Sequence, residues 1–333
     1  MPTPRVRLNE AALKKQIALL QRIGIPSDHE DEVPIALSPS VMGMLNLVTV
    51  AINHQTTPVH GVALTGTIFG RERRGWDYLR ESFLAAARHD ASIVSPSRLA
   101  EFTIAQLNSI LKGSPIKRPK ERVELLHDIG TKMCEAGWED IDALYRGAQR
   151  ALLRKDGSGI LQQLAAFRAY ADPLRKKSNY FCAIMQNQGL WRFRDPGNLG
   201  PPVNYHESRL LARLGILRIA DPELHEKLRR GWEVTEEEDF ALRKAAYRAI
   251  VRVAKALNVS PSAMHYLDWN FARNCCTRSN PHCTGCDASC VLPTRYRIGE
   301  HENPRCVFSD ICPSRDLPEG ERLLDPFSET IWH

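Results

Sequence analysis

Seven of the nine cysteines of this chain lie between Cys275 and Cys312, and this cluster restricts the C-terminal fold more than any other feature. Disulfide frameworks belong to small secreted chains, whereas this sequence has 333 residues, an odd number of cysteines and no secretory-type apolar stretch in its opening run MPTPRVRLNEAALKKQ. Too few apolar residues lie between 272 and 306 to form a core there, so ligand bonds must order the segment. The sequence therefore predicts a metal-thiolate or iron–sulfur site.

Most of the remaining chain shows helical periodicity. Apolar residues recur at i, i+3, i+4 and i+7 in LNEAALKKQIALLQRI, PSVMGMLNLVTVAIN, WDYLRESFLAAARH, PSRLAEFTIAQLNSILK, KERVELLHDIGTKMC, IDALYRGAQRALL, GILQQLAAFRAYA and FALRKAAYRAIVRVAKAL. Proline, glycine and N-cap residues separate these segments, and strand candidates are few. We therefore predict an all-α fold of ten or more helices. Its parts are a helical domain of one or two lobes at 1–270, a metal-cluster loop at 271–316 and an extended tail at 317–333.

Charge and hydropathy restrict the partners. The chain is 43% apolar and 25% charged, which is typical of a globular protein with its own core. No stretch approaches about eighteen uncharged apolar residues, so we expect a cytoplasmic protein without a membrane partner. The net charge of +6, with arginine-rich runs such as RERR at 71–74, permits a modified nucleotide or a nucleic acid as partner.

The cysteine spacing indicates which cofactor to expect. Cys276, Cys283 and Cys286 form the pattern C-x6-C-x2-C, and a C-x5-C pair ends at Cys312. This spacing resembles the iron–sulfur loop at the C-terminal end of endonuclease III-type DNA glycosylases, where four thiolates hold a four-iron cluster. The resemblance implies a 4Fe-4S cluster held by Cys276, Cys283, Cys286 and Cys312.

The chain departs from that pattern through an insertion after Cys286, which contains Cys290 and Cys306. The third ligand is therefore ambiguous, with Cys306 as the main alternative to Cys286. Cys275 is expected to be a buried neighbour of the site.

The alternative cofactor is zinc, bound by the same cysteines together with His282 or His301. Zinc accepts both sulfur and imidazole ligands, so cysteine spacing does not exclude it. We expect a structural role for the metal in either case, because the sequence shows no motif for an electron-transfer partner.

A second motif lies upstream, in PPVNYHESRLLARLGIL at 201–217. Two prolines and then Asn204 in an N-cap position predict the start of a helix. The segment resembles the helix of helix-hairpin-helix glycosylases that opens with V-D-T-H-x-x-R. The matching residues are Val203, Asn204, Tyr205, His206 and Arg209.

The aspartate of that family stabilises the sugar cation or activates the attacking water, and Asn204 cannot supply its negative charge. Either Glu207 or Asp195 replaces it, or Asn204 orients the water, or hydrolysis is lost and only binding remains. We take Asn204 and Glu207 as the candidate catalytic residues. No lysine hairpin of the type LPGVGxKTA precedes Asn204, so lyase activity is not expected.

Residues 45–217 also resemble the queuosine-salvage N-glycosylases, which release a deazaguanine base from a nucleoside 5′-phosphate. The resemblance is carried by Gly75-Trp76, by Arg122 to Gly130, by Phe167-Arg168 with Asp172 and Lys176-Lys177, and by Asn204-Tyr205.

That resemblance implies roles for individual side chains in substrate binding. Trp76 or Tyr205 would stack on the base, Lys176 or Lys177 would meet a phosphate, and Asp172 would be a polar anchor. His206 is a further candidate contact. Each also has a structural alternative: core packing for the two aromatic residues and His206, a solvated helix start for the lysines, and simple helix capping for Asn204.

Together these motifs predict a monofunctional N-glycosylase that hydrolyses the base–sugar bond of a modified purine or deazaguanine nucleotide. The alternative is a catalytically silent, or base-excision-type, nucleic-acid-binding protein of the DNA glycosylase superfamily. A third possibility is a zinc-braced interaction protein. The fold implied is a helix-hairpin-helix glycosylase-like helical fold with a C-terminal cluster loop.

Overall fold

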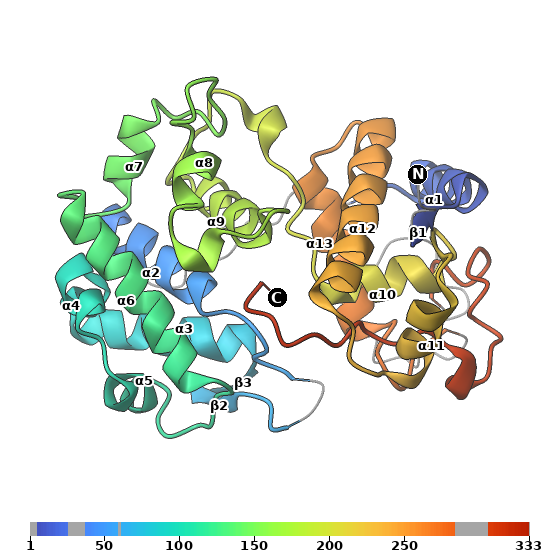
Figure 1. Ribbon diagram of the computed structural model, residues 1–333, viewed down its shortest axis with the longest axis horizontal. Coiled ribbons are helices and arrows are strands. Elements are labelled where there is room, and N and C mark those ends of the chain that lie inside the picture. The colour runs from blue at the N-terminus through green and yellow to red at the C-terminus, as the bar shows by residue number, and fades with distance from the viewer. Residues whose placement is uncertain (1–4, 26–36, 59–60, 284–305, 333) are drawn as a thin grey trace. The chain divides into compact units, whose positions relative to one another are not determined.

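The computed structural model describes residues 5–25, 37–58, 61–283 and 306–332. Within these ranges the chain is mostly helical, with 13 α-helices and four short strands (Figure 1), so the predicted helical class is confirmed. The chain divides into two compact units. Unit 1 combines Met1–His29 with Gly200–Glu329, and unit 2 comprises Glu30–Leu199 and Thr330–His333. None of the helices in the described ranges combines the length and apolar character needed to cross a bilayer.

Unit 2 is built around a central helix, α2, which is buried along most of its length. Every residue of α2 from Met42 to Ala51 is buried, so α2 lacks a polar face, as expected for a helix surrounded by others. The elements of unit 2 are α2 (Pro39–Ala51), β2 (Thr65–Ile68), β3 (Arg71–Arg74), α3 (Trp76–His89), η1 (Ala91–Val94), α4 (Pro96–Ala100), α5 (Ile104–Ile110), α6 (Pro119–Glu135), α7 (Asp142–Gly147), α8 (Ile160–Leu164), η2 (Arg168–Tyr170), α9 (Lys176–Asn187) and η3 (Pro196–Asn198).

Gly130, the last residue of the sequence motif from Arg122 to Gly130, permits a close crossing of α4 and α6. A Cβ atom on Gly130 would lie 2.3 Å from the backbone nitrogen of Ala100. Because α4 approaches α6 at this point, only glycine leaves room for the backbone of α4.

One predicted helix is divided in two. Periodicity predicted a single helix over 96–112, but α4 ends at Ala100 and α5 begins at Ile104. Thr103 and Gln106 form a capping box, in which Thr103 Oγ1 accepts from Gln106 N (3.2 Å) and Gln106 Oε1 accepts from Thr103 N (2.7 Å). The local cap therefore starts a new helix inside a periodic segment.

Unit 1 joins the start of the chain to its C-terminal part. Strand β1 pairs antiparallel with β4, with Val6 opposite Ile219, and α10 packs against α12 and α13. The elements are β1 (Val6–Leu8), α1 (Glu10–Ile23), α10 (Tyr205–Arg213), β4 (Leu217–Ile219), α11 (Pro222–Arg230), α12 (Glu236–Leu257), α13 (Pro261–Asn274) and η5 (Glu319–Glu321). Helix α13 continues to Asn274, so the cysteine segment begins at Cys275 rather than at 271.

Candidate metal centre

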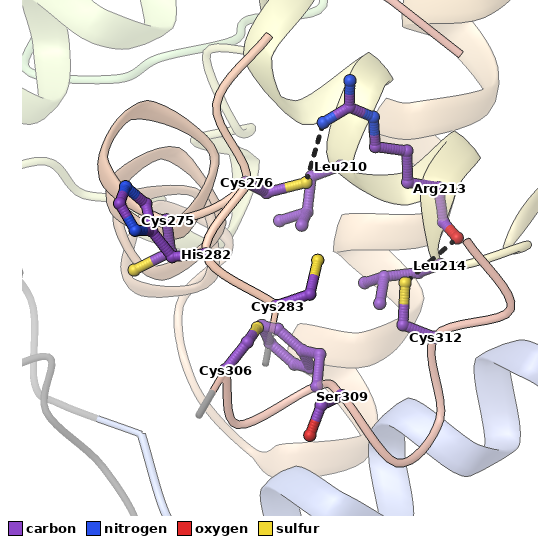
Figure 2. A pocket seen from close by; sticks show the side chains of 11 residues that line it. Leu210, Arg213, Leu214, Cys275, Cys276, His282, Cys283, Cys306, Ser309 and Cys312 are labelled. Atoms are coloured by element: carbon purple, nitrogen blue, oxygen red, sulfur yellow. Dashed lines mark hydrogen bonds between the residues drawn. The ribbon is translucent and has the colours of Figure 1, made fainter. Parts of the chain in front are cut away.

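Five cysteines of unit 1 line one cavity, and the sulfur atoms of four of them lie around or at the edge of its central space (Figure 2). These four are Cys276, Cys283, Cys306 and Cys312. The cavity contains about 320 Å³ of space free of protein atoms, part of it open to solvent, and its walls include the apolar side chains of Leu210, Leu214 and Phe308. Figure 2 shows the sulfur atoms of Cys276, Cys283 and Cys312 around a common space with Cys306 at its edge, whereas the sulfur of Cys275 points away, beside His282.

The backbone at the end of α13 turns so that Cys276 faces this cavity (Figure 2). The N–H groups of Cys275 and Cys276 both donate to the carbonyl of Phe271, at 2.9 and 2.7 Å, which ends the helix in a tight turn. The ring of Phe271 also packs edge-on against Phe308, with centroids 5.0 Å apart. This contact fixes the segment that carries Cys312 on the end of α13.

Arg213, in the last turn of α10, binds the cysteine segment. Its Nη1 donates to the carbonyl of Thr277 (2.7 Å) and to the sulfur of Cys276 (3.5 Å), and its Nη2 donates to the carbonyl of Arg278 (2.8 Å). In return, the thiol of Cys312 donates to the carbonyl of Arg213 at 3.4 Å. Arg213 is buried and was not among the predicted site residues; only its helical spacing from Arg209 could have drawn attention to it.

Arg209, one turn earlier on α10, connects the same segment to the C-terminal tail. Its Nε donates to the carbonyl of Cys276 (2.9 Å), and its guanidinium pairs with the buried carboxylate of Asp325. Asp325 also pairs with Arg278 at 3.2 Å. Burial lowers the pKa of Arg209 to about 10, so the side chain stays charged at neutral pH.

The cavity is poorly suited to free thiolates. Burial raises the pKa of Cys312 to about 11 and the pKa of Cys306 well above its usual value, and it also raises the pKa of Cys283. A bound metal would displace these protons, because its charge replaces the missing solvation.

The structure describes some of the predicted metal ligands and not others. Cys276, Cys283 and Cys312 line the cavity together with the alternative ligand Cys306. Cys286, Cys290 and His301 lie outside the described residues. Among the residues that the structure does describe, no group of three or more His, Cys, Asp and Glu side chains is arranged to hold a metal ion.

The candidate catalytic residues Asn204 and Glu207 form a capping box at the start of α10. The Asn204 side-chain oxygen accepts from His206 N (2.7 Å), and a Glu207 oxygen accepts from Asn204 N (2.9 Å). Glu207 is completely buried, and its other oxygen lies 2.5 Å from Nδ1 of His265. The carboxylate therefore holds α10 in place and has no contact with solvent.

A second buried carboxyl group lies on α13 near Glu207. Asp268 is fully buried, and neither of its oxygens has a hydrogen-bond partner among the described residues. Burial, and secondly the charge of Glu207, raise the pKa of Asp268 well above its ordinary value. Sequence patterns did not single out Asp268 or His265, which lie one turn apart on a helix that periodicity failed to predict.

Replacing Asp268 with asparagine is expected to stabilise the protein at neutral and alkaline pH. The folded protein keeps the Asp268 proton at pH values where the unfolded chain has released it, so wild-type stability falls as pH rises above about 4, by about 1.4 kcal/mol per pH unit until the folded pKa is reached. Thermal unfolding of both proteins between pH 4 and pH 8 tests this. The advantage of D268N should vanish toward pH 4, and an equal advantage at every pH would contradict it.

The neighbouring substrate-binding candidates lie in the first turn of α10. Tyr205 and His206 are half-buried, and their ring centroids are 4.2 Å apart. Nδ1 of His206 lies 3.4 Å from a guanidinium nitrogen of Arg209. His206 is thus linked to the arginine that binds the cysteine segment.

The other substrate-binding candidates belong to unit 2, around the start of α9. Asp172 is buried and accepts from the N–H groups of Leu174 (3.2 Å) and Lys176 (3.0 Å). The Lys176 ammonium lies 6.0 Å from the ring centroid of Tyr180, and Trp76 contacts the same ring edge-on at 5.4 Å. The structure therefore brings Trp76, Lys176 and Asp172 to one end of α9.

Lys177 has a different environment from Lys176. It is completely buried, and its ammonium donates to the carbonyl of Ala51 at 2.5 Å, at the C-terminal end of α2. Burial, with smaller contributions from Lys176 and Arg122, lowers the pKa of Lys177 well below its usual value. A lysine at this position caps helix α2, which favours a structural role over phosphate binding.

Arg122 shares this capping role. Its guanidinium donates to the carbonyls of Ile52 and His54, and its Nε donates to the carbonyl of Lys117 at 2.9 Å. Burial lowers the pKa of Arg122 to about 9. Buried His54, whose pKa is lowered well below 6.5 first by burial and then by Arg122, completes the cluster.

The sequence matches no protein-family model and no curated protein. Within the described residues the fold and the site therefore define a mostly helical, two-unit protein with a cysteine-lined cavity in the unit formed by Met1–His29 and Gly200–Glu329.

Proposed function

We propose that this chain is an N-glycosidic hydrolase of the helix-hairpin-helix glycosylase kind whose unit 1 is braced by a 4Fe-4S cluster. One observation carries the proposal: helix α10 bears both motifs. Its first turn holds Asn204, and its last turn holds Arg213, which donates to the sulfur of Cys276. The candidate catalytic segment and the candidate cluster site are therefore parts of one packed assembly.

Four of the cysteines would hold the cluster. Cys276, Cys283 and Cys312 share the cavity, and Cys306 is the described candidate for the fourth position, with Cys286 as its alternative. When bound, the cluster supplies metal–thiolate bonds that order the surrounding segment. Zinc would use the same thiolates, and metal analysis distinguishes the two.

The contacts of the carboxylates bear on how hydrolysis would proceed. One oxygen of Glu207 accepts from Asn204 N and the other lies 2.5 Å from Nδ1 of the buried His265, so Glu207 is proposed as a positioning residue that orients Asn204. Asp195 accepts from the N–H groups of Leu152 (2.7 Å) and Leu153 (3.0 Å), which is a structural role in unit 2. Orientation of the attacking water is thus assigned to the half-buried Asn204.

Asn204→Asp is expected to increase base release by about 100-fold, because a fixed negative charge stabilises the oxocarbenium-like transition state. Asn204→Ala should reduce release below the wild-type rate. The substrates are deazaguanine nucleoside 5′-phosphates and oligonucleotides that contain modified purines, with the free base quantified by chromatography. Failure of both wild type and N204D to release any base would contradict the proposal.

A specific observation favours a second candidate, a catalytically silent binder. Glu207 and Asp195, the two carboxylates that could replace the missing aspartate, are both held in structural hydrogen bonds. Turnover by N204D alone, with tight binding but no turnover by wild type, would establish this alternative.

A further inference from the structure

A two-stranded hairpin of unit 2 presents an aromatic side chain at its tip. Strands β2 and β3 pair from Thr65 opposite Arg74 to Ile68 opposite Arg71, which leaves Phe69 and Gly70 as a two-residue turn. The hairpin is firmly seated on α3 (Figure 1), because a Cβ on Gly66 would lie only 2.5 Å from the ring of Tyr78. Its tip is therefore held in a defined place.

Phe69 is an unfavourable choice for this turn. Phe69 and Gly70 have φ values of 50° and 72°, the combination that two-residue hairpin turns require and that asparagine–glycine satisfies best. A bulky residue in the left-handed region costs about 1–2 kcal/mol. Phe69 is also 41% exposed, so a substantial part of its ring faces solvent at a strained turn position. The exposed ring is therefore a candidate for contact with a partner.

One arginine lies beside this ring, and two others on strand β3 have no carboxylate partner among the described residues. Arg71 and Arg74 are exposed and form no ion pair with any residue that the structure describes, and the guanidinium carbon of the exposed Arg88 lies 5.9 Å from the Phe69 ring centroid. Of the hairpin's other charged residues, Arg73 is paired with Glu81 at 2.8 Å, and Glu72 is the hairpin's own carboxylate. Strand β3 therefore carries three arginines and one glutamate, and a fourth arginine, Arg88, lies beside the ring at the tip.

We propose that the β2–β3 hairpin binds an unpaired segment of a nucleic-acid strand. Arginine forks match the geometry of phosphate oxygens, and an exposed aromatic ring stacks on any base. The proposal deepens the proposed function, on which its biological meaning rests, because it specifies a nucleic-acid chain as the substrate class rather than a free nucleotide. An anionic membrane is a poorer match, since stable membrane binding needs a larger apolar area than one ring supplies.

Substitution of Phe69 by asparagine tests oligonucleotide binding without weakening the folded hairpin. Asparagine tolerates the left-handed conformation, so F69N should unfold at the same or a higher temperature than wild type. Its dissociation constant for a short fluorescein-labelled single-stranded oligonucleotide, measured by anisotropy, should rise by about 5- to 100-fold. In the double variant R71A/R74A, the slope of log affinity against log salt should fall by about 1.5.

Matched controls change similar groups elsewhere on the surface. Trp232→Ala removes another exposed aromatic ring, which is 58% exposed, and R22A/R98A removes the same positive charge from two other exposed positions. Both should bind within about twofold of wild type, so equal losses in these controls would overturn the proposal.

The remaining outcomes separate this proposal from the proposed function. Unchanged oligonucleotide binding by F69N, or wild-type binding to anionic lipid vesicles but not to DNA or RNA oligonucleotides, overturns the hairpin proposal. Hairpin-dependent binding without base release from any substrate supports it and contradicts the hydrolase. Base release from free nucleotides without oligonucleotide binding supports the hydrolase and overturns the hairpin proposal.

Discussion

Replacement of Cys276 by serine is expected to lower the iron content from about four atoms per chain to less than one and to destabilise unit 1. Cys276 lines the cavity at the end of α13 and receives the hydrogen bond from Arg213. Without its thiolate, the proposed cluster would lose a ligand, and the sequence between 272 and 306 contains too few apolar residues to form a core in its place. Iron and sulfide analysis, together with limited proteolysis of this segment, measures the effect.

Cys134→Ser is the matched control, because Cys134 is an exposed thiol in unit 2. It should leave metal content and protease resistance unchanged. Serine at Cys306 or at Cys286 decides which of the two completes the set, since only the true ligand should reproduce the loss seen with C276S. Full metal content in C276S would contradict the assignment of Cys276 as a metal ligand. One zinc atom per chain and no iron in the wild-type protein would show that the site binds zinc instead of an iron–sulfur cluster.

Arg209→Met is expected to destabilise the protein by about 3–5 kcal/mol, because it removes one partner of a buried ion pair. Arg209 and Asp325 are both almost fully buried, and Arg278 alone then remains to pair with the carboxylate. The same substitution removes the donor to the carbonyl of Cys276, so iron incorporation should fall as well. Urea unfolding and iron analysis of the purified variant provide both measurements.

Two further variants identify the cause of this loss. Asp325→Asn combined with R209M should recover part of the stability, because it removes the buried carboxylate charge that Arg209 neutralised, but it should not restore the contact with Cys276. Arg252→Ala breaks an exposed ion pair with Glu10 and should cause no measurable change. If R209M unfolded at the wild-type urea concentration, Arg209 would not brace the site.

The helices that could be predicted are those with a local signal. Helix α3 runs from Trp76 to His89, which are the bounds that its periodic segment predicted, because it has one buried and one solvated face. Helix α9 was anticipated only at its start, by Lys176 and Lys177, and α13 was not predicted, since both helices are buried on most sides and lack amphipathic alternation. The break before α5 required attention to the capping residues Thr103 and Gln106 rather than to hydrophobic period.

The candidate site shows the same contrast. The helix start at Asn204 was predictable because proline and N-cap preferences act within a few residues. The ion pair between Glu207 and His265 was not, because it joins α10 to α13 across a large separation in sequence. The contact buries Glu207 against α13, and for this reason the proposed hydrolysis gives Glu207 a positioning role rather than the activation of water.

The sequence by itself determined that cysteines are concentrated in the C-terminal part of the chain, that most of the rest is helical, and that asparagine stands where the glycosylase helices that this segment resembles carry aspartate. These properties depend on residue type and short spacing. Only the tertiary structure decided that Cys306 and Cys312 share a cavity with Cys276 and Cys283, and that α10 supplies the arginines which hold it. The physical reason is that contacts between distant segments depend on how α10, α13 and the tail pack, which no local pattern encodes.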